Sequence, residues 1–177
     1  MPGETSLLLL VNGLRAPWLD PVMQFLSDWG LYGFLLTLVV VLAARRTPES
    51  ARTTRDGWLA FFTSLFLSET VLKPLIGRPR PTAIVAVREQ LHVLGTVPSA
   101  TSTSLPSGTA TACMAGATWI ALRFGPRWGA LAIAAAMFLS LTRLYVGVHY
   151  PTDLLAGWVV GSLTALGVDR FTAWAGR

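Results

Sequence analysis

Long apolar stretches separated by short charged segments limit the folds that are open to this chain. A helix needs about 20 residues to cross roughly 30 Å of hydrocarbon, and several stretches approach that length. Hydrophobic residues make up 53% of the 177 residues and charged residues only 13%, whereas a soluble domain is about one quarter charged. The composition excludes a disordered chain and disfavours an ordinary water-soluble enzyme.

Five stretches are predicted to cross a membrane as helices, namely residues 29–44, 57–76, 106–122, 128–147 and 151–168. The second differs from the others because it contains Glu69 and Lys73. An earlier apolar run, residues 5–14, is too short to span and is followed by Pro17 and Pro21. Residues 1–28 are therefore predicted to form an interfacial helix and turn.

The basic residues predict an orientation. One face of the bundle would carry the loop 45–56, the turn 123–127 and the tail 169–177, with 8 of the 14 Lys and Arg residues, and the other face would carry 6. The positive-inside rule makes the first face and the C-terminus cytoplasmic, and it places the loop 77–105 outside. The net charge of +5 then reflects topology, so no nucleic-acid partner is expected. Tryptophans near the cytoplasmic ends are predicted to form an aromatic belt: Trp58, Trp119, Trp128 and Trp174.

The chain is predicted to form a single membrane-embedded domain, residues 1–177. Gly157 and Gly161 form a pair of small residues four positions apart. Such pairs serve helix dimerisation or close packing inside one bundle. We favour packing inside one bundle, and the oligomeric state stays open. Cys113 is the only cysteine, so no internal disulfide is possible, and we expect it to be a small core residue.

Three cations lie at the predicted outer ends of the spans. Lys73 lies near the end of the second span, Arg80 follows that span, and Arg143 lies near the end of the fourth. Charges at membrane depth are costly and are usually functional or paired. Because few carboxylates lie nearby in the sequence, these three side chains are predicted to bind an anion, with arginine able to grip two oxygens.

The start of the third span adds a second anion-binding element. Pro106 suits the first turn of a helix, where no N–H group is needed. The backbone N–H groups of Ser107, Gly108 and Thr109 would then lie free at the positive end of a helix dipole. That arrangement is typical of a phosphate site.

His149 and Asp153 supply a possible nucleophile and its partner. A neutral imidazole can attack phosphorus without the charge repulsion that an anionic nucleophile meets. A carboxylate on the other ring nitrogen fixes the tautomer and stabilises the cation that forms. The two residues are four apart, one helical turn. No cluster of Asp, Glu or His has metal-ligand spacing, so neither a metal nor another cofactor is expected.

Taken together, these motifs resemble the type 2 phosphatidic acid phosphatase superfamily of lipid phosphate phosphatases, over roughly residues 57–170. The family has a Lys-x6-Arg-Pro motif, a Pro-Ser-Gly-His motif and a Ser-Arg-x5-His-x3-Asp motif, matched here by Lys73, Arg80 and Pro81, by Pro106, Ser107 and Gly108, and by Arg143, His149 and Asp153. The resemblance implies an all-α integral-membrane helical bundle. It also implies that the histidine forms a phosphohistidine, that the aspartate orients it, and that the lysine and both arginines bind the phosphoryl group.

The chain departs from the family at two positions. Thr142 replaces the usual serine and keeps the hydroxyl. Thr109 replaces the histidine that the family uses as general acid, and a threonine hydroxyl does not titrate near neutral pH. General acid–base catalysis contributes about 10²–10⁴-fold, so we expect substrate binding with poor turnover. An engineered substitution, a naturally slow enzyme and a pseudo-enzyme all fit this difference, and rescue by His92 is a further, less favoured option.

The leading hypothesis is a lipid phosphatase of the bacterial inner membrane, with its site facing the extracytoplasmic side. Phosphatidate, phosphatidylglycerol phosphate, polyprenyl diphosphates and lipid A phosphates are the substrates that the resemblance implies, and neither the headgroup nor the lipid chain is fixed. The alternatives are a non-catalytic lipid-phosphate binder and a lipid phosphotransferase. A transporter ranks third, since only Glu69 and Lys73 lie near mid-span.

Four neighbouring residues have simpler interpretations. Glu69 lies one turn before Lys73 and is predicted to pair with it, with a catalytic acid role as the minor option. Arg78 is as well suited to contact a diphosphate or a lipid headgroup as to face water. Tyr145 and Tyr150 are predicted to pack at the membrane interface.

Overall fold

The computed structural model describes residues 2–28, 48–95 and 97–175. Within them the chain is helical apart from turns, loops and one isolated bridge between Pro79 and Thr103. The elements in chain order are α1 (Pro2–Asn12), a helical segment at residues 20–28, α3 (Pro48–Phe66), a π-helical segment (Leu67–Leu72), α4 (Lys73–Ile76), a 3-10 turn (Pro81–Ala83), α5 (Val85–Arg88), α6 (Gly108–Phe124), α7 (Pro126–Tyr145) and α8 (Pro151–Ala175).

Three helices are long and apolar enough to cross a membrane: Arg52–Ile76, Pro126–Tyr145 and Pro151–Ala175. They coincide with the second, fourth and fifth predicted spans. The third coincides with α6, whose 17 residues measure about 25 Å at 1.5 Å per residue. The first predicted span, residues 29–44, lies outside the described residues, so the expected count of five is not established.

The helix ends correct two of the predicted loops. Residues 48–56 were expected in a cytoplasmic loop, but α3 already begins at Pro48, because proline is well suited to a first helical turn. The predicted tail 169–177 is helical as far as Ala175. Asp169 in this part of α8 forms an ion pair with Arg123 of α6, with 2.5 Å between Oδ1 and Nη2.

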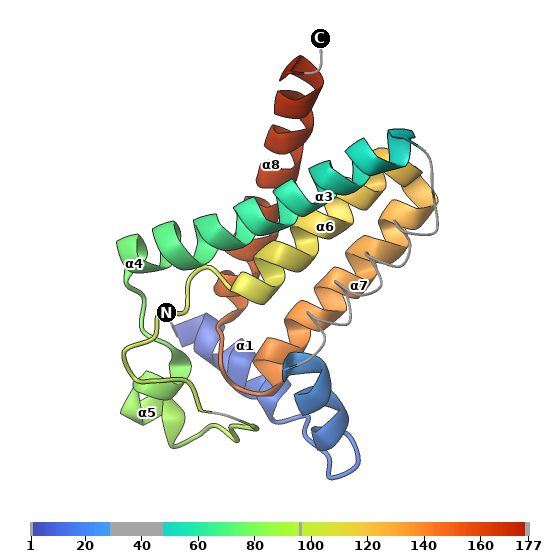
Figure 1. The fold of residues 1–177 in the computed structure, drawn as a ribbon. Helices are drawn as coiled ribbons and strands as arrows, with labels where there is room; N and C mark the ends of the chain where they lie inside the picture. Colours follow the sequence, from blue (N-terminus) through green and yellow to red (C-terminus); the bar gives the residue numbers. More distant parts are fainter. Residues whose placement is uncertain (1, 29–47, 96, 176–177) are drawn as a thin grey trace.

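Helix α6 is the centre of the bundle and packs against α3, α7 and α8. Figure 1 shows α3, α6 and α7 side by side, with α8 crossing them and extending past the others toward the C-terminus. Four alanines of α6 and Cys113 are fully buried, as expected for the cysteine. Trp119 is also buried, with 1% of its surface exposed, and a Cβ on Gly57 would lie 3.0 Å from its ring. Its predicted place in an aromatic belt is therefore wrong, whereas Trp128 and Trp174 are exposed.

Gly157 and Gly161 allow α8 to approach α6 closely. A Cβ on Gly157 would lie 2.8 Å from the Ala110 Cβ, and one on Gly161 would lie 2.2 Å from the Thr111 carbonyl oxygen. The interpretation of this pair as close packing inside one bundle is confirmed. The approach matters for the site because it brings the first turn of α8 next to the first turn of α6.

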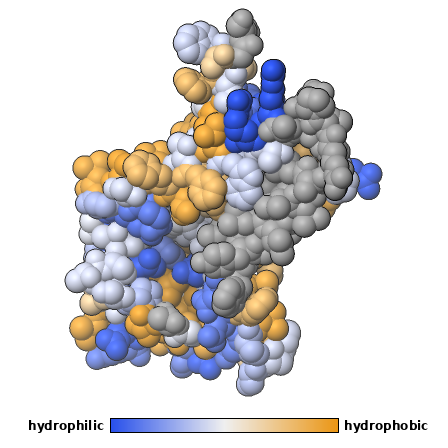
Figure 2. All heavy atoms as spheres, in the orientation of Figure 1, coloured by the Kyte–Doolittle hydropathy of each residue, from blue (hydrophilic) through white to orange (hydrophobic). Residues whose placement is uncertain are grey.

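The outer surface separates apolar from polar residues. Figure 2 shows an apolar band along α3, hydrophilic residues below it over the loop side of the bundle, and a second hydrophilic group above it beside α8. Exposed apolar side chains such as Phe62, Phe66, Leu75 and Leu163 suit a lipid environment, since their exposure to water would be unfavourable.

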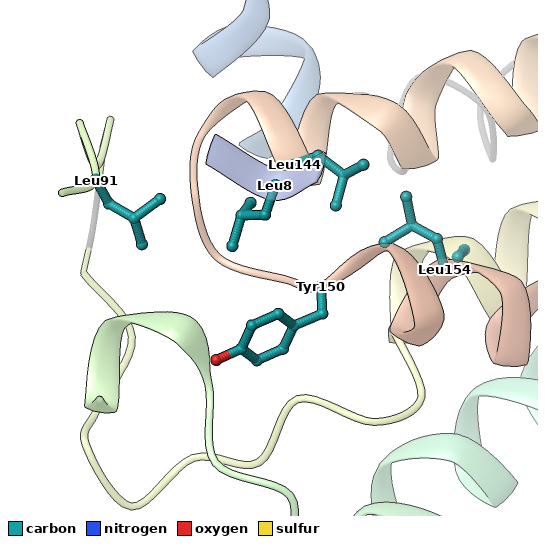
Figure 3. Packing of buried hydrophobic residues seen from close by; sticks show 6 residues of the cluster. Leu8, Leu91, Leu144, Tyr150 and Leu154 are labelled. Carbon is teal, nitrogen blue, oxygen red and sulfur yellow. The ribbon is translucent and has the colours of Figure 1, made fainter. Parts of the chain in front are cut away.

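Helix α1 packs over the loop end of the bundle. Leu8 of α1 is fully buried in a cluster with Leu91, Leu144, Tyr150 and Leu154, which Figure 3 shows converging from α1, the 77–105 loop, α7 and the start of α8. In the same region the Asn12 amide donates to the carbonyls of His92 and Tyr145. The expected N-terminal helix is present, and it contacts the 77–105 loop, the end of α7 and the start of α8.

We predict that Gly161→Ala destabilises the protein by about 1–3 kcal/mol or more, because overpacking forces two backbones apart. Gly167→Ala is the matched control on the same helix, since nothing lies within 4 Å of its added Cβ. The control should be neutral or stabilising by up to about 1 kcal/mol through helix propensity. Thermal denaturation in detergent, followed by circular dichroism, measures both, and equal effects of the two variants would contradict the close approach.

Candidate active site

Asp153 is positioned by the way α8 begins. Pro151 is the first residue of the helix, a favoured place for proline. The Tyr150 backbone N–H donates to the Asp153 carboxylate at 2.8 Å, which is half of a capping box. This local bond turns the Asp153 side chain back toward His149. The oxygen that accepts it, Asp153 Oδ2, also lies 3.2 Å from Nδ1 of His149.

The neighbours of His149 determine its tautomer. Its Nε2 lies 3.1 Å from Nη1 of Arg80, and a guanidinium can only donate. Nε2 must therefore carry the lone pair, and Nδ1 carries the proton and donates it to Asp153. This is the tautomer that a nucleophilic imidazole requires, with its free electron pair directed at a cation.

Burial keeps this imidazole neutral. His149 is 2% exposed, and burial lowers its pKa to about 3. The positive charges of Arg80 and Arg143 act in the same direction, while Asp153 opposes them. A neutral histidine at physiological pH retains its nucleophilic lone pair.

Lys73 is the first residue of α4, and Arg80 lies on the connection that follows this helix. Lys73 is buried and donates to both carboxylate oxygens of Glu69, at 2.6 and 2.7 Å, which confirms the predicted ion pair. Arg80 donates to the Val148 carbonyl and to the Ser102 hydroxyl. These bonds hold its guanidinium against the 148–149 turn.

The first turn of α6 forms another wall of the site, with one correction to the prediction. Ser107 is the N-cap and α6 begins at Gly108, so Pro106 lies just before the helix and not in its first turn. The Ser107 N–H was expected to be free, but it donates to the Asp153 carbonyl at 3.0 Å. Gly108 and Thr109 occupy the helix start, where N–H groups have no intrahelical partner. The buried Ser107 Oγ has no hydrogen-bond partner among the described residues.

Arg143, in the last turn of α7, is held from the N-terminal segment. Its Nη1 donates to the carbonyl and the hydroxyl of Ser27, at 2.8 and 2.6 Å. Its buried Nε has no partner within the part of the chain that the structure describes. Ser27 was missed at the sequence level, because nothing in the pattern of residues 1–28 relates it to a motif more than 100 residues away.

Arg78 is the second contact that the sequence did not indicate. Its guanidinium donates to Asp153 Oδ1 at 2.8 Å and to the Thr152 hydroxyl at 2.7 Å. It also pairs with Glu4 of α1 and lies 4.2 Å from the centre of the Tyr150 ring. Arg78 therefore faces neither bulk water nor an open headgroup site, but positions the carboxylate that orients His149.

Three other residues can now be placed. Tyr145 and Tyr150 are buried, with 2% and 4% of their surfaces exposed, so the prediction that they pack at the membrane interface is wrong. The Tyr145 hydroxyl donates to Asp20 and accepts from the Ala16 N–H. His92 is exposed in the loop, in line with its interpretation as a solvated residue.

The fold and the site together define an integral-membrane helical bundle in which His149 lies between Arg80 and Asp153 at one end. The family model described as PAP2 superfamily matches residues 57–177, more than half of the chain. The chain belongs to this superfamily, as its motifs indicated.

Comparisons with individual proteins agree with this assignment. An undecaprenyl-diphosphatase from Sulfolobus acidocaldarius is 33% identical over 90% of this chain and 73% of the relative. Phosphatidylglycerophosphatase B from Bacillus subtilis is 31% identical over 89% of this chain and 77% of the relative. The crystal structure of Aquifex aeolicus LpxE superposes with a TM-score of 0.77 over 93% of both chains at 24% identity, which supports the fold.

We predict that Arg78→Gln destabilises the protein by about 3 kcal/mol, because it leaves the buried Asp153 carboxylate without its ion-pair partner. Arg78→Lys should lose less, since it keeps the charge but not the planar fork. Arg88→Gln, at an exposed position on α5, is the matched control and should have little effect. Chemical denaturation in detergent measures all three. An Arg78→Gln variant as stable as the control would contradict the positioning role.

The lowered pKa of His149 predicts a pH dependence of stability. As the pH falls below the ordinary histidine pKa of about 6.5, the unfolded chain takes up a proton at this residue, whereas the folded chain does not until about pH 3. Stability contributed by neutral His149 is therefore complete above pH 6.5 and declines toward pH 3. Melting temperatures at pH 7.5 and pH 5 should fall more for the unsubstituted chain than for His149→Gln, and equal falls would contradict the burial argument.

Proposed function

We propose that this chain is a membrane lipid phosphatase that transfers the phosphoryl group of a lipid phosphate to His149 and then to water. The observation that carries this proposal is the direction of the His149 lone pair, which points from a neutral, buried ring at the Arg80 guanidinium. The named activities of the two curated relatives, one on undecaprenyl diphosphate and one on phosphatidylglycerophosphate, support the same reaction class.

Binding of the phosphoryl group would use the donors that line the site. Lys73, Arg80 and Arg143 neutralise its charge, so the chemistry as proposed needs no metal ion or other cofactor. The N–H groups at the start of α6 add the helix dipole. The Ser107 Oγ and the Arg143 Nε, both buried and without a described partner, are the two donors that a phosphoryl oxygen would satisfy. A buried donor without a partner costs about 1–3 kcal/mol, which favours occupation by an anion.

The reaction would proceed in two steps. In the first, Nε2 of His149 forms a bond to phosphorus and the bond from phosphorus to the lipid oxygen breaks, while Asp153 stabilises the developing imidazolium charge. In the second, water attacks the phosphohistidine and releases inorganic phosphate, which restores the neutral imidazole.

The first step is impaired in this chain by Thr109. The departing lipid oxygen needs a proton, and Thr109 lies in the first turn of α6, where the family places a histidine. Slow turnover is therefore the expected behaviour. The same residue favours the second candidate function, a lipid-phosphate binder that does not turn over.

The site is proposed to face the extracytoplasmic side, with the C-terminus in the cytoplasm. In support, the site lies at the end of the bundle that carries α1 and the 77–105 loop, while α8 extends the C-terminus toward the opposite end (Figure 1). Arg55 and Arg123 lie with Asp56 and Asp169 at that opposite end, as the positive-inside rule predicts for the cytoplasmic face. A polyprenyl diphosphate or a phosphatidyl lipid of a bacterial-type inner membrane is the preferred substrate, and residues 1–177 act as one domain.

Release of inorganic phosphate from phosphatidate and from a polyprenyl diphosphate in detergent tests the proposal. We expect Thr109→His to raise turnover by about 10²–10⁴-fold, the usual contribution of a general acid. The double variant Thr109→His/His149→Ala should be inactive. Equal activity of the unsubstituted chain and Thr109→His would refute the general-acid argument. No release from either, with lipid-phosphate affinity retained by His149→Ala, would favour the binder.

A further inference from the structure

We propose that Glu69 is an internal anion that occupies part of the phosphate site and keeps it closed until the phosphoryl group of the substrate displaces it. This inference rests on the proposed function and concerns how the same site is regulated. It assigns to Glu69 a role opposite in sign to that of a residue that merely orients Lys73.

The position of the Glu69 carboxylate is the first argument. It accepts two hydrogen bonds from the Lys73 ammonium, at 2.6 and 2.7 Å. Its Oε1 would lie only 2.0 Å from a Cβ built on Gly108, so the carboxylate rests against the first turn of α6. It thus contacts two of the elements to which we assign phosphate binding, a cation and a helix N-terminus.

The charge of Glu69 also reaches the two arginines of the site. Its negative charge acts on the guanidinium groups of Arg80 and Arg143. The Glu69 carboxylate is bound to Lys73 and interacts electrostatically with Arg80 and Arg143. A bound phosphoryl group is proposed to interact with the same three cations. The carboxylate is an electrostatic substitute for the substrate.

Burial shows that this arrangement is a closed one. His149 is 2% exposed, and Lys73 and Arg80 are each 8% exposed, so these three side chains present little surface to a substrate in this arrangement. The Glu69 side chain is 43% exposed and is the charged group of this cluster with the easiest path to water. Rotation of this one side chain outward would free Lys73 and uncover the helix start.

The Glu69 carboxylate does not satisfy every donor of the proposed phosphate site, so a substrate that satisfies more of them could displace it. The Ser107 Oγ and the Arg143 Nε lack partners in the described chain even though Glu69 is in place. A carboxylate offers two oxygens, whereas a phosphoryl group offers three and carries more charge. The additional acceptors would satisfy donors that Glu69 leaves unpaired.

The helix that carries Glu69 is irregular at this point. Residues Leu67–Leu72 form a π-helical segment between α3 and α4, and such segments occur frequently at functional sites. Within this segment Glu69 lies against Gly108, and Lys73 follows one helical turn later.

Binding of inorganic phosphate to the purified chain in detergent, measured by isothermal titration calorimetry, tests the inference without requiring turnover. Glu69→Gln removes the charge and keeps the shape. Since the binding-competent minor state of such an equilibrium is typically below about 10% populated, we expect the variant to bind phosphate about tenfold more tightly or better. Glu89→Gln, at an exposed loop position, is the matched control and should bind as the unsubstituted chain does.

Several outcomes would overturn the inference. Equal phosphate affinity of Glu69→Gln and the unsubstituted chain would show that Glu69 does not compete. Weaker binding by Glu69→Gln would show that Glu69 serves the site by orienting Lys73. Should Glu69→Gln fail to fold, Glu69→Asp, whose shorter side chain withdraws the carboxylate from Gly108, must show a smaller gain in affinity, and no gain would again refute the inference.

Failure of this inference can be distinguished from failure of the proposed function. If Thr109→His releases phosphate from lipid but Glu69→Gln brings no gain in affinity, only the inference is wrong. If Thr109→His is inactive and neither the unsubstituted chain nor Glu69→Gln binds phosphate, both fail together.

Discussion

The contacts of Asp153 connect the elements on which the site depends. Its carboxylate accepts from the Tyr150 N–H, the His149 ring and the Arg78 guanidinium, while its backbone carbonyl accepts from the Ser107 N–H. One residue thus caps α8, sets the histidine tautomer and fixes the distance between the starts of α8 and α6. Gly157 and Gly161 make that short distance sterically possible, so the packing of the bundle and the chemistry of the site depend on the same helix pair.

Local relationships could be predicted from the sequence, because they join residues only one turn apart. The pair of Glu69 and Lys73 and the pair of His149 and Asp153 are each four residues apart, and both form as expected. The ordered motifs also predicted the family correctly. The helix ends were less predictable, since α3 begins within a charged stretch at Pro48 that hydropathy assigns to a loop.

Contacts that join the N-terminal segment to the motifs could not be predicted. The bonds of Ser27 to Arg143 and of Asn12 to Tyr145 cross more than 100 residues, and a hydropathy pattern contains no information about such pairs. The prediction for Trp119 was wrong for a related reason, because a tryptophan near a helix end suits both a membrane interface and a core. Only the glycine opposite it, Gly57 on α3, selects the core.

The long-range contacts of Glu4 have a consequence for how the protein folds. Glu4 pairs with Arg78 and accepts a hydrogen bond from the Thr152 hydroxyl, so α1 meets its second partner only after the residues between them have been synthesised. Contacts of such high sequence separation form late, because the loop between them must first be ordered. A nascent chain would therefore insert its early helices well before it possesses an assembled site. The contacts that join α1 to the first turn of α8 would form together, at the moment when the start of the last helix docks.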